Sequence, residues 1–242
     1  MKGSDEFTQS QHGLEQFLGD VRQRMIGELR ATPLGQMIED FGSLLGSGKM
    51  LRSRMAYRLE PTSGVPREEL VAACAAVEMI HAASLLHDDV IDGGIVRRGS
   101  PTFWLERGIS GAILLGDLLL FKALHITCNV KDRNDWTSKL VALTGEVCEA
   151  ESVQELLLRG GPPTWAQCVQ IARQKTGALF AFIGYASGAN QPGLQPILTE
   201  AGYLIGTSYQ LADDILDITG NEEISGKTLG TDRKHNKVTA AS

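Results

Sequence analysis

The sequence predicts an all-α protein. Apolar residues recur at helical spacing in long segments, no segment alternates apolar and polar residues with a period of two, and clusters of glycine and proline separate the segments. The 242 residues are enough for one domain with a sizeable core. We therefore expect a single bundle of helices.

The first part of the chain predicts three helices. Apolar side chains within residues 14–29 recur at helical spacing and give one helix a single apolar stripe. A second helix is expected at residues 34–45, until the sequence GSG interrupts the pattern. A third is expected from residue 49 to near residue 61, where a proline stands.

The central helix is the best defined. Pro66 suits the first helical position, with Glu68 and Glu69 in the first turn. We expect this helix to run to about Asp92, where a Gly-Gly pair ends it. Its middle is apolar on nearly all sides, so it should be buried in the centre of the bundle.

The remaining segments continue the helical pattern. Thr164 is expected to cap the helix that follows the sequence GGPP. The expected helices lie at residues 102–106, 109–127, 136–158, 164–187 and 196–217.

Composition and charge exclude several classes of protein. The formal net charge of −6 and the lack of a long Lys/Arg run argue against a nucleic-acid partner. The four cysteines are widely spaced without a C-x-x-C pair, so we expect reduced thiols and a cytoplasmic location.

The start of the chain and its most apolar stretch bear on targeting. The polar residues 1–13 lack the apolar region of a signal peptide, and we expect a disordered tail or cloning remnant there, with the helical domain at residues 14–242. The stretch ISGAILLGDLLLFKAL is interrupted by Asp117 and Lys122, so we expect no transmembrane segment.

Three aspartates end the central helix, within HAASLLHDDVIDGGIVRRGSPT. Asp88 and Asp92 lie one helical turn apart, with Asp89 beside Asp88. Like charges at this spacing repel one another on a surface helix, whereas two carboxylates one turn apart suit Mg²⁺, which prefers oxygen ligands. Arg97 and Arg98 follow in a glycine-flanked loop, and arginine binds phosphate oxygens in pairs.

The same acidic spacing recurs near the end of the chain. Residues 210–217 read QLADDILD, in which Asp213, Asp214 and Asp217 repeat the pattern D-D-x-x-D. The first stretch alone is also compatible with a solvated acidic helix end followed by a basic loop. Two such clusters on separate helices are harder to explain in that way. Facing each other, they would bracket a pyrophosphate through several Mg²⁺ ions.

These motifs resemble those of the trans-isoprenyl (polyprenyl) diphosphate synthases. The family motif D-D-x-x-D-x4-R-R-G-x-P-T fits residues 88–102 at every fixed position. The second family motif, G-x-x-x-Q-x-x-D-D-x-x-D, fits residues 206–217, including Gly206 and Gln210. The resemblance implies a single-domain antiparallel helical bundle around a central cavity, of the isoprenoid synthase type. Family members usually continue for several more helices, so this chain is short at its carboxyl terminus.

The resemblance gives roles to two basic residues after the GSG break. Lys49 and Arg52, in SGKMLRS, match the family element G-G-K-x-x-R-P, which holds the diphosphate of isopentenyl diphosphate. Ser47 replaces the first glycine of this element, and Ser53 replaces its proline. Without the resemblance, the two basic residues would be surface charges at a helix start.

Further substrate contacts are implied by the same resemblance. His81 and Arg98 match contacts to isopentenyl diphosphate, and Arg97 matches a contact to the allylic diphosphate. A single histidine in a buried helix is otherwise more often a hydrogen-bonded core residue. His87 is expected to orient Asp88.

The later part of the chain supplies the remaining matches. Lys175 and Thr176 match a family pair in which the lysine binds the allylic diphosphate, while the threonine and the residue matching Gln210 present oxygens to the carbocation. Lys227 matches a lysine that closes over the diphosphate, and Lys237 lies where the family has a further lysine.

The pattern E-x-x-Q of Glu151 and Gln154 matches a family element that could support the metal site. Helix packing and polar networks account for this pair equally well.

Together the matches imply a reaction and its cofactor. Mg²⁺, three ions per site, would be held by the two aspartate clusters. With Arg97, Lys175 and Lys227 it would stabilise the departing pyrophosphate. The double bond of isopentenyl diphosphate would attack the allylic carbocation and lengthen the trans-polyprenyl chain. The family is typically homodimeric, so a homodimer is expected.

Other functions are compatible with parts of the sequence. A non-catalytic or regulatory subunit of a heteromeric synthase would keep the fold, although it would be free to lose the acidic and basic residues that this chain retains. A terpene cyclase typically lacks the second D-D-x-x-D, and head-to-head synthases use another acidic spacing.

Product length is predicted from the residue five positions before Asp88. In relatives with short products this position is often aromatic, whereas here it is Ala83. A small side chain leaves the cavity open one turn deeper, toward Met79 and Ile80. We therefore expect a product longer than farnesyl diphosphate.

Overall fold

The computed structural model describes residues 2–37, 48–97, 99–158, 160–161 and 164–219 of the chain. Side chains are described within these ranges from residue 11 to residue 216, Met37 excepted. The elements are the helices α1 (Lys2–Arg30), η1 (Pro33–Met37), α3 (Leu51–Ser63), α4 (Arg67–Ile91), α5 (Phe103–Cys128), α6 (Asn134–Leu156), α7 (Trp165–Ala172), η2 (Arg173–Gly177), α8 (Ala178–Ser187) and α9 (Gln195–Thr219), and the strands β1 (Val96–Arg97) and β2 (Ser100–Pro101).

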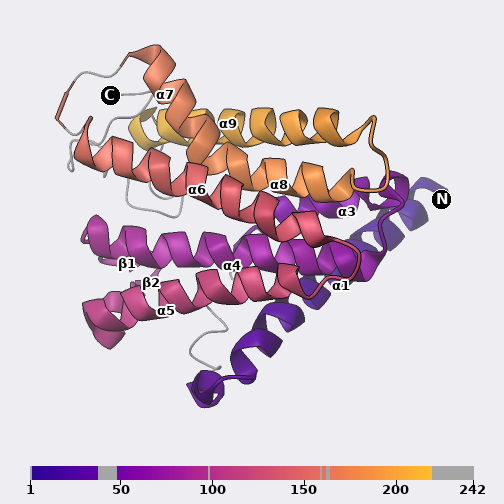
Figure 1. The fold of residues 1–242 in the computed structure, drawn as a ribbon, viewed down its shortest axis with the longest axis horizontal. Coiled ribbons are helices and arrows are strands. Elements are labelled where there is room, and N and C mark those ends of the chain that lie inside the picture. The colour runs from indigo at the N-terminus through magenta and orange to yellow at the C-terminus, as the bar shows by residue number, and fades with distance from the viewer. Residues whose placement is uncertain (1, 38–47, 98, 159, 162–163, 220–242) are drawn as a thin grey trace.

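The all-α class is confirmed, because the strands in the described ranges are limited to one hairpin, β1–β2, with two residues in each strand. α4 is the central helix and packs against α1, α3, α5 and α8 (Figure 1). α4 pairs most extensively with α5, and α8 with α9. As the apolar pattern predicted, the side chains of α4 between Leu70 and Leu86 are mostly buried.

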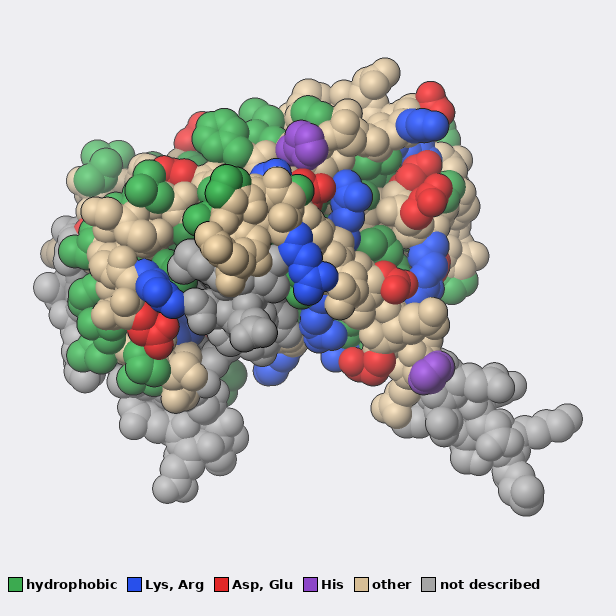
Figure 2. All heavy atoms as spheres, turned by 90° about the horizontal axis from the view of Figure 1, so that it is seen from below, with side chains coloured by type: hydrophobic (Ala, Val, Ile, Leu, Met, Phe, Trp, Pro, Cys, Tyr) green, Lys and Arg blue, Asp and Glu red, His purple; other side chains and the backbone are tan. Residues whose placement is uncertain are grey.

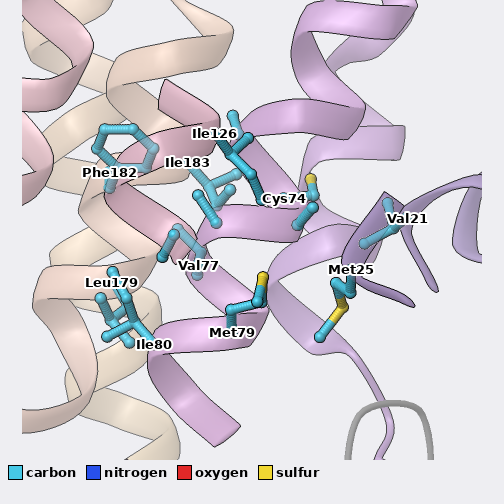
Figure 3. Packing of buried hydrophobic residues seen from close by; sticks show 14 of the residues in the cluster. Val21, Met25, Cys74, Val77, Met79, Ile80, Ile126, Leu179, Phe182 and Ile183 are labelled. Carbon is cyan, nitrogen blue, oxygen red and sulfur yellow. The ribbon is translucent and has the colours of Figure 1, made fainter. Parts of the chain in front are cut away.

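The main core lies between α4 and its neighbours (Figure 3). Ile80 lies beside Leu179 of α8, whereas Met79 lies on the side of α4 that faces Met25 of α1. Each of these four side chains is at most 2% exposed. Full burial of one such side chain stabilises a fold by about 1.5–3 kcal/mol. Because these side chains contact α1 on one side and α8 on another, burial holds α4 from several sides.

Several expected helix ends were wrong by a few residues. α3 contains Pro61 instead of ending there, and it closes at Gly64, whose φ of 67° is the left-handed conformation that favours glycine. The helices expected at 102–106 and 109–127 form one element, α5, but Gly108 interrupts it with non-helical angles at the expected boundary. The helix expected at 34–45 lies largely outside the described residues.

α1 begins at Lys2, so helical structure extends through the residues expected to form a tail. Thr164 caps α7 as expected, and it forms a reciprocal capping box with Gln167. The division of the chain at residue 13 stays a prediction.

In the part of the chain that the structure describes, two helices are long and apolar enough to cross a membrane by length and composition alone. The apolar window of α4 is 72% buried, as in the core helix of a soluble protein, and that of α5 is 33% buried. One or two such helices are weak evidence of a membrane protein, so the expectation of no transmembrane segment stays a prediction.

The surface has an apolar region at one end. Figure 2 shows hydrophobic side chains gathered at the end where Figure 1 places the hairpin and the start of α5, while basic and acidic side chains alternate toward the other end. Large exposed side chains of α5 include Leu114 (67% exposed) and Phe121 (72% exposed).

Candidate active site

The first acidic motif lies at the carboxyl end of α4. Asp88 and Asp92 are both half-buried and lie one turn apart, and Asp92 is the C-cap residue of the helix. Asp89 is 6% exposed, and both of its carboxylate oxygens accept hydrogen bonds from Arg97. The distances from Arg97 Nε to Asp89 Oδ1 and Oδ2 are 2.8 and 2.9 Å. A bidentate pair of this kind fixes the motif on one side.

The β1–β2 hairpin holds Arg97 in this position. Val96 pairs with Pro101, and Arg97 pairs with Ser100. The turn is tied back to the end of α4, because the Thr102 hydroxyl and the Trp104 indole N–H both donate to the carbonyl of Gly94 at 2.7 and 2.8 Å. Arg98 lies outside the described residues.

A π-helical turn, η2, carries Lys175 and Thr176. Such turns are rare inside α-helices and occur frequently at functional sites. The Lys175 ammonium forms an ion pair with Glu151 of α6. Burial alone would lower the pKa of Lys175, but the charges of Asp88, Glu151 and Asp92 outweigh it and raise this pKa above 10.5. The lysine therefore stays charged beside the first acidic motif.

The neighbouring residue of η2 reaches the second acidic motif. The Thr176 hydroxyl donates to Gln210 Oε1 at 2.6 Å, and Gln210 Nε2 donates to Asp214 Oδ1 at 2.8 Å. Asp214 is 7% exposed and Asp213 is half-buried. The side chain of Asp217 lies outside the described residues. The charges of the first motif thus act on Lys175, and the adjacent Thr176 donates a hydrogen bond to Gln210 of the second motif.

Close backbone packing makes this contact possible. A Cβ atom added to Gly206 would lie 2.6 Å from Gly177 Cα and 2.9 Å from the carbonyl oxygen of Thr176. Side chains essentially never approach so closely, so only glycine lets α9 lie this near η2. The glycine of the second motif therefore has a packing role that its spacing alone did not reveal.

α3 supplies Arg52, which lies against α8. Arg52 is 8% exposed, and its guanidinium lies 5.1 Å from the centroid of the Phe180 ring of α8. Lys49 is exposed at the start of this segment. Between them, Met50 has a φ of 47° and a ψ of 49°, a left-handed conformation that costs a non-glycine residue roughly 1–2 kcal/mol. Residues held in this way cluster at functional sites.

The two histidines of α4 differ in their surroundings. His81 is half-buried, two turns before Asp88. His87 Nε2 lies 3.2 Å from the carbonyl oxygen of Ile113 and 3.4 Å from Asp117 Oδ1, both in α5. His87 therefore fastens α4 to α5, which the sequence did not predict.

The residues present fit a hard divalent cation in part. Within the ranges that the structure describes, no three Asp, Glu, His or Cys side chains approach closely enough to form a metal site by themselves. Asp88 and Asp92 offer carboxylates from successive turns, and Asp213 and Asp214 offer two more from α9. Such oxygen donors suit Mg²⁺, which takes its other ligands from water and substrate phosphates.

Sequence reasoning missed several partners of the site. The ion pair between Glu151 and Lys175 and the pair between Asp89 and Arg97 join residues that had been assigned to metal or substrate. The motif places Asp89 and Arg97 eight residues apart but does not show that they pair, and no fixed spacing connects Glu151 of α6 with Lys175 of η2. Lys227 and Lys237 lie outside the described residues.

A helical bundle with two acidic motifs at one end of a buried central helix defines a protein of the isoprenoid synthase fold. The polyprenyl synthase of Caulobacter crescentus, solved in complex with calcium and isoprenyl diphosphate, matches this structure with a TM-score of 0.83 and 28% sequence identity, over 93% of this chain and 69% of that one.

The sequence comparisons identify the family. The family model described as polyprenyl synthetase matches residues 36–242, and the chain belongs to this family. Geranylgeranyl diphosphate synthase of Methanosarcina mazei is 32% identical over 199 residues, which are 79% of this chain and 61% of the relative. Farnesyl diphosphate synthase of Escherichia coli is 35% identical over 223 residues, covering 86% and 74%. The chain thus spans about three fifths of the length of the first relative.

Proposed function

We propose that this protein is a trans-prenyltransferase that condenses isopentenyl diphosphate with an allylic diphosphate and releases pyrophosphate. The observation that carries the proposal is the η2 turn. Its Lys175 lies beside the first acidic motif, and its Thr176 is linked through Gln210 to the second. Relatives named as prenyl diphosphate synthases support this reaction class.

The chain's own residues divide into three tasks. Lys175 and Arg97 are cations at the first motif, where a departing diphosphate would gather negative charge. Thr176 and Gln210 present oxygens near the second motif, where an allylic cation would be stabilised. Lys49, Arg52 and His81 would hold the diphosphate of isopentenyl diphosphate.

Exclusion of water is a further requirement, because water would quench the cation. The buried side chains of α4 and α8 provide an apolar interior below the polar residues at the end of α4.

Mg²⁺ is part of the proposal. Asp88, Asp89, Asp92, Asp213, Asp214 and Asp217 would hold it, and Asp89 also forms an ion pair with Arg97. When bound, the metal would neutralise charge on the diphosphate. On the family motifs we extend the substrate contacts to Arg98, Lys227 and Lys237. Three ions per site is the expected number.

The test is a reaction of the purified protein with Mg²⁺, labelled isopentenyl diphosphate, and geranyl, farnesyl or geranylgeranyl diphosphate in turn. We expect label in longer prenyl chains and a loss of about a hundred- to thousandfold in Asp88→Ala and Asp213→Ala, the size typical of removing one electrostatic stabiliser. Circular dichroism controls for folding. No turnover by folded protein with any primer would refute the proposal and favour the regulatory-subunit alternative.

We also propose that the product is longer than farnesyl diphosphate. Ala83 is fully buried one turn below Asp88, and the next side chains toward the core are Met79 and Ile80. Ala83→Phe would place an aromatic ring in this path, and chromatographic sizing should then show shorter chains. A main product of ten or fifteen carbons from the wild-type protein would contradict this prediction.

A homodimer is proposed on the exposed apolar side chains of α5, including Leu114 and Phe121. Patches of this kind mark interaction sites in soluble proteins. Light scattering after gel filtration should report a dimer, and Phe121→Lys should weaken it. A cytoplasmic location belongs to the same proposal, since all four cysteines are free thiols.

A further inference from the structure

A buried polar contact joins α3 to α4 away from both acidic motifs. The Ser53 hydroxyl donates to Glu78 Oε1 at 2.8 Å, and the Ser53 backbone N–H points to the same oxygen at 3.4 Å. Ser53 is 0% exposed and Glu78 is 7% exposed. Glu78 is a single acidic residue within the apolar stretch AACAAVEMIHAA. A carboxylate in such a place is costly unless it is hydrogen-bonded.

The contact depends on the residue type at position 53. Ser53 lies in the first turn of α3, where backbone N–H groups have no partner within the helix. The preceding N-cap residue, Met50, makes no side-chain cap. The Glu78 carboxylate takes the place of such a cap, because it accepts a hydrogen bond from the Ser53 hydroxyl and also faces the Ser53 backbone N–H. The proline of the family motif has neither group to donate, so this contact belongs to the serine of this chain.

Arg52 directly precedes Ser53 in the first turn of α3 and is 8% exposed. Its guanidinium lies against the Phe180 ring, and its Nε is buried without a hydrogen-bond partner. Burial lowers the pKa of Arg52, and the charge of Glu78 is the strongest opposing effect. A buried guanidinium with an unused N–H is prepared for an anionic ligand.

We propose that Ser53 and Glu78 are positioning residues for Arg52. The hydrogen bond between the Ser53 hydroxyl and the Glu78 carboxylate ties the first turn of α3 to α4. Arg52 lies in that turn, so its guanidinium is held against the Phe180 ring, in place for the diphosphate of isopentenyl diphosphate. The inference rests on the proposed function, and it makes this serine a determinant of affinity for one of the two substrates only.

The test separates the two substrates. In Ser53→Ala, KM for isopentenyl diphosphate should rise about three- to tenfold, the effect of one lost hydrogen bond. In Glu78→Gln it should rise roughly ten- to a hundredfold, the effect of a lost charged partner. In both variants kcat and KM for the allylic substrate should change less than about twofold. The double variant should resemble Glu78→Gln, because Ser53 acts through Glu78.

Ser63→Ala is the matched control. Ser63 is also a buried serine of α3, 3% exposed, but its hydroxyl donates to the Glu60 carbonyl and accepts from the Val65 N–H. This variant should lower the melting temperature without changing KM for isopentenyl diphosphate. The proposal is overturned if Ser53→Ala and Ser63→Ala behave alike, or if both substrates lose affinity equally in Ser53→Ala.

Titration calorimetry measures the binding of isopentenyl diphosphate directly, so the test does not depend on turnover. If the wild-type protein binds isopentenyl diphosphate without elongating any primer, the proposed reaction fails, but weaker binding by Ser53→Ala still supports the positioning role. A wild-type protein that turns over yet shows no change in Ser53→Ala overturns the positioning role alone. No binding by folded wild-type protein overturns both.

Discussion

The two acidic motifs share one spacing but are held by different forces. In the first, Asp89 forms a bidentate ion pair with Arg97, and the charges of Asp88 and Asp92 act on Lys175. In the second, Asp214 accepts a hydrogen bond from the neutral amide of Gln210. The contact described for Asp89 in the first motif is therefore a pair of full charges, whereas the contact described for Asp214 in the second comes from an uncharged amide.

The backbone around the two motifs differs as well. The first ends a helix and continues into a turn tied to the Gly94 carbonyl. The second lies within α9, which is brought to η2 by the close approach of Gly206 and Gly177. The comparison teaches that identical D-D-x-x-D patterns do not imply identical environments, and changes to each side should have different consequences.

The largest effect is expected from the charged side. Lys175→Met should lower kcat about a hundred- to thousandfold, because it removes the positive charge that lies near Asp88, Asp92 and Glu151 and would stabilise the departing diphosphate. Lys175→Arg should keep part of the activity. Lys139→Met is the control for loss of a lysine charge, and kcat should stay near normal. The Lys139 ammonium lies over the Tyr185 ring, 5.4 Å from its centroid, and has no assigned role at the acidic motifs. Near-normal kcat in Lys175→Met would break the comparison.

The charge of Lys175 also has a pH signature. Its pKa is raised above 10.5 in the folded state, so its stabilising contribution is fully present below pH 10.5 and is lost as the pH rises through the higher folded value. The free energy of unfolding of the wild type relative to Lys175→Met should therefore not fall between pH 7 and 10. A decline within this range would contradict the assignment.

A smaller effect is expected from the bidentate pair. Arg97→Ala leaves the buried Asp89 carboxylate without this partner, which should lower the free energy of unfolding by roughly 1.5–3 kcal/mol. KM for the allylic substrate should rise as well. The change Asp89→Asn together with Arg97→Ala should recover part of the stability, because the buried charge is removed. Chemical denaturation of the single and double variants measures both outcomes.

On the uncharged side, Thr176→Val removes one hydroxyl donor and keeps the side-chain shape. It should cost about 0.5–1.5 kcal/mol of stability. Unlike Arg97→Ala, this loss should hardly depend on salt, because Gln210 is neutral. Thermal unfolding at low and high salt compares the two variants, and equal salt dependence would remove the proposed distinction.

Two glycines test the backbone packing beside the second motif. Gly206→Ala places a Cβ 2.6 Å from Gly177 Cα, so α9 must move away from η2 at a cost of about 1–3 kcal/mol. Gly145→Ala is the matched change in α6, where an added Cβ meets nothing within 4 Å. It should stabilise the protein by roughly 0.5–1 kcal/mol. Opposite shifts in melting temperature are expected, and a fall for Gly145→Ala would contradict the packing account.

The sequence by itself determined the all-α class, the buried central helix and the two acidic motifs. Apolar periodicity and motif spacing are local properties, and a helix converts them directly into faces and turns. The capping box at Thr164 and the break at Gly108 were predictable for the same reason.

Only the tertiary structure decided how the motifs are held. The pairs Asp89–Arg97, Glu151–Lys175 and Ser53–Glu78 each join two different elements. The motif fixes the spacing of Asp89 and Arg97 but does not show that they pair, and no fixed spacing connects the partners of the other two pairs. The π-helical form of η2 likewise differs from the regular helix expected there. Sequence fixes which residues share a helix face, whereas the packing of helices against one another decides which charges and hydrogen-bonding groups meet.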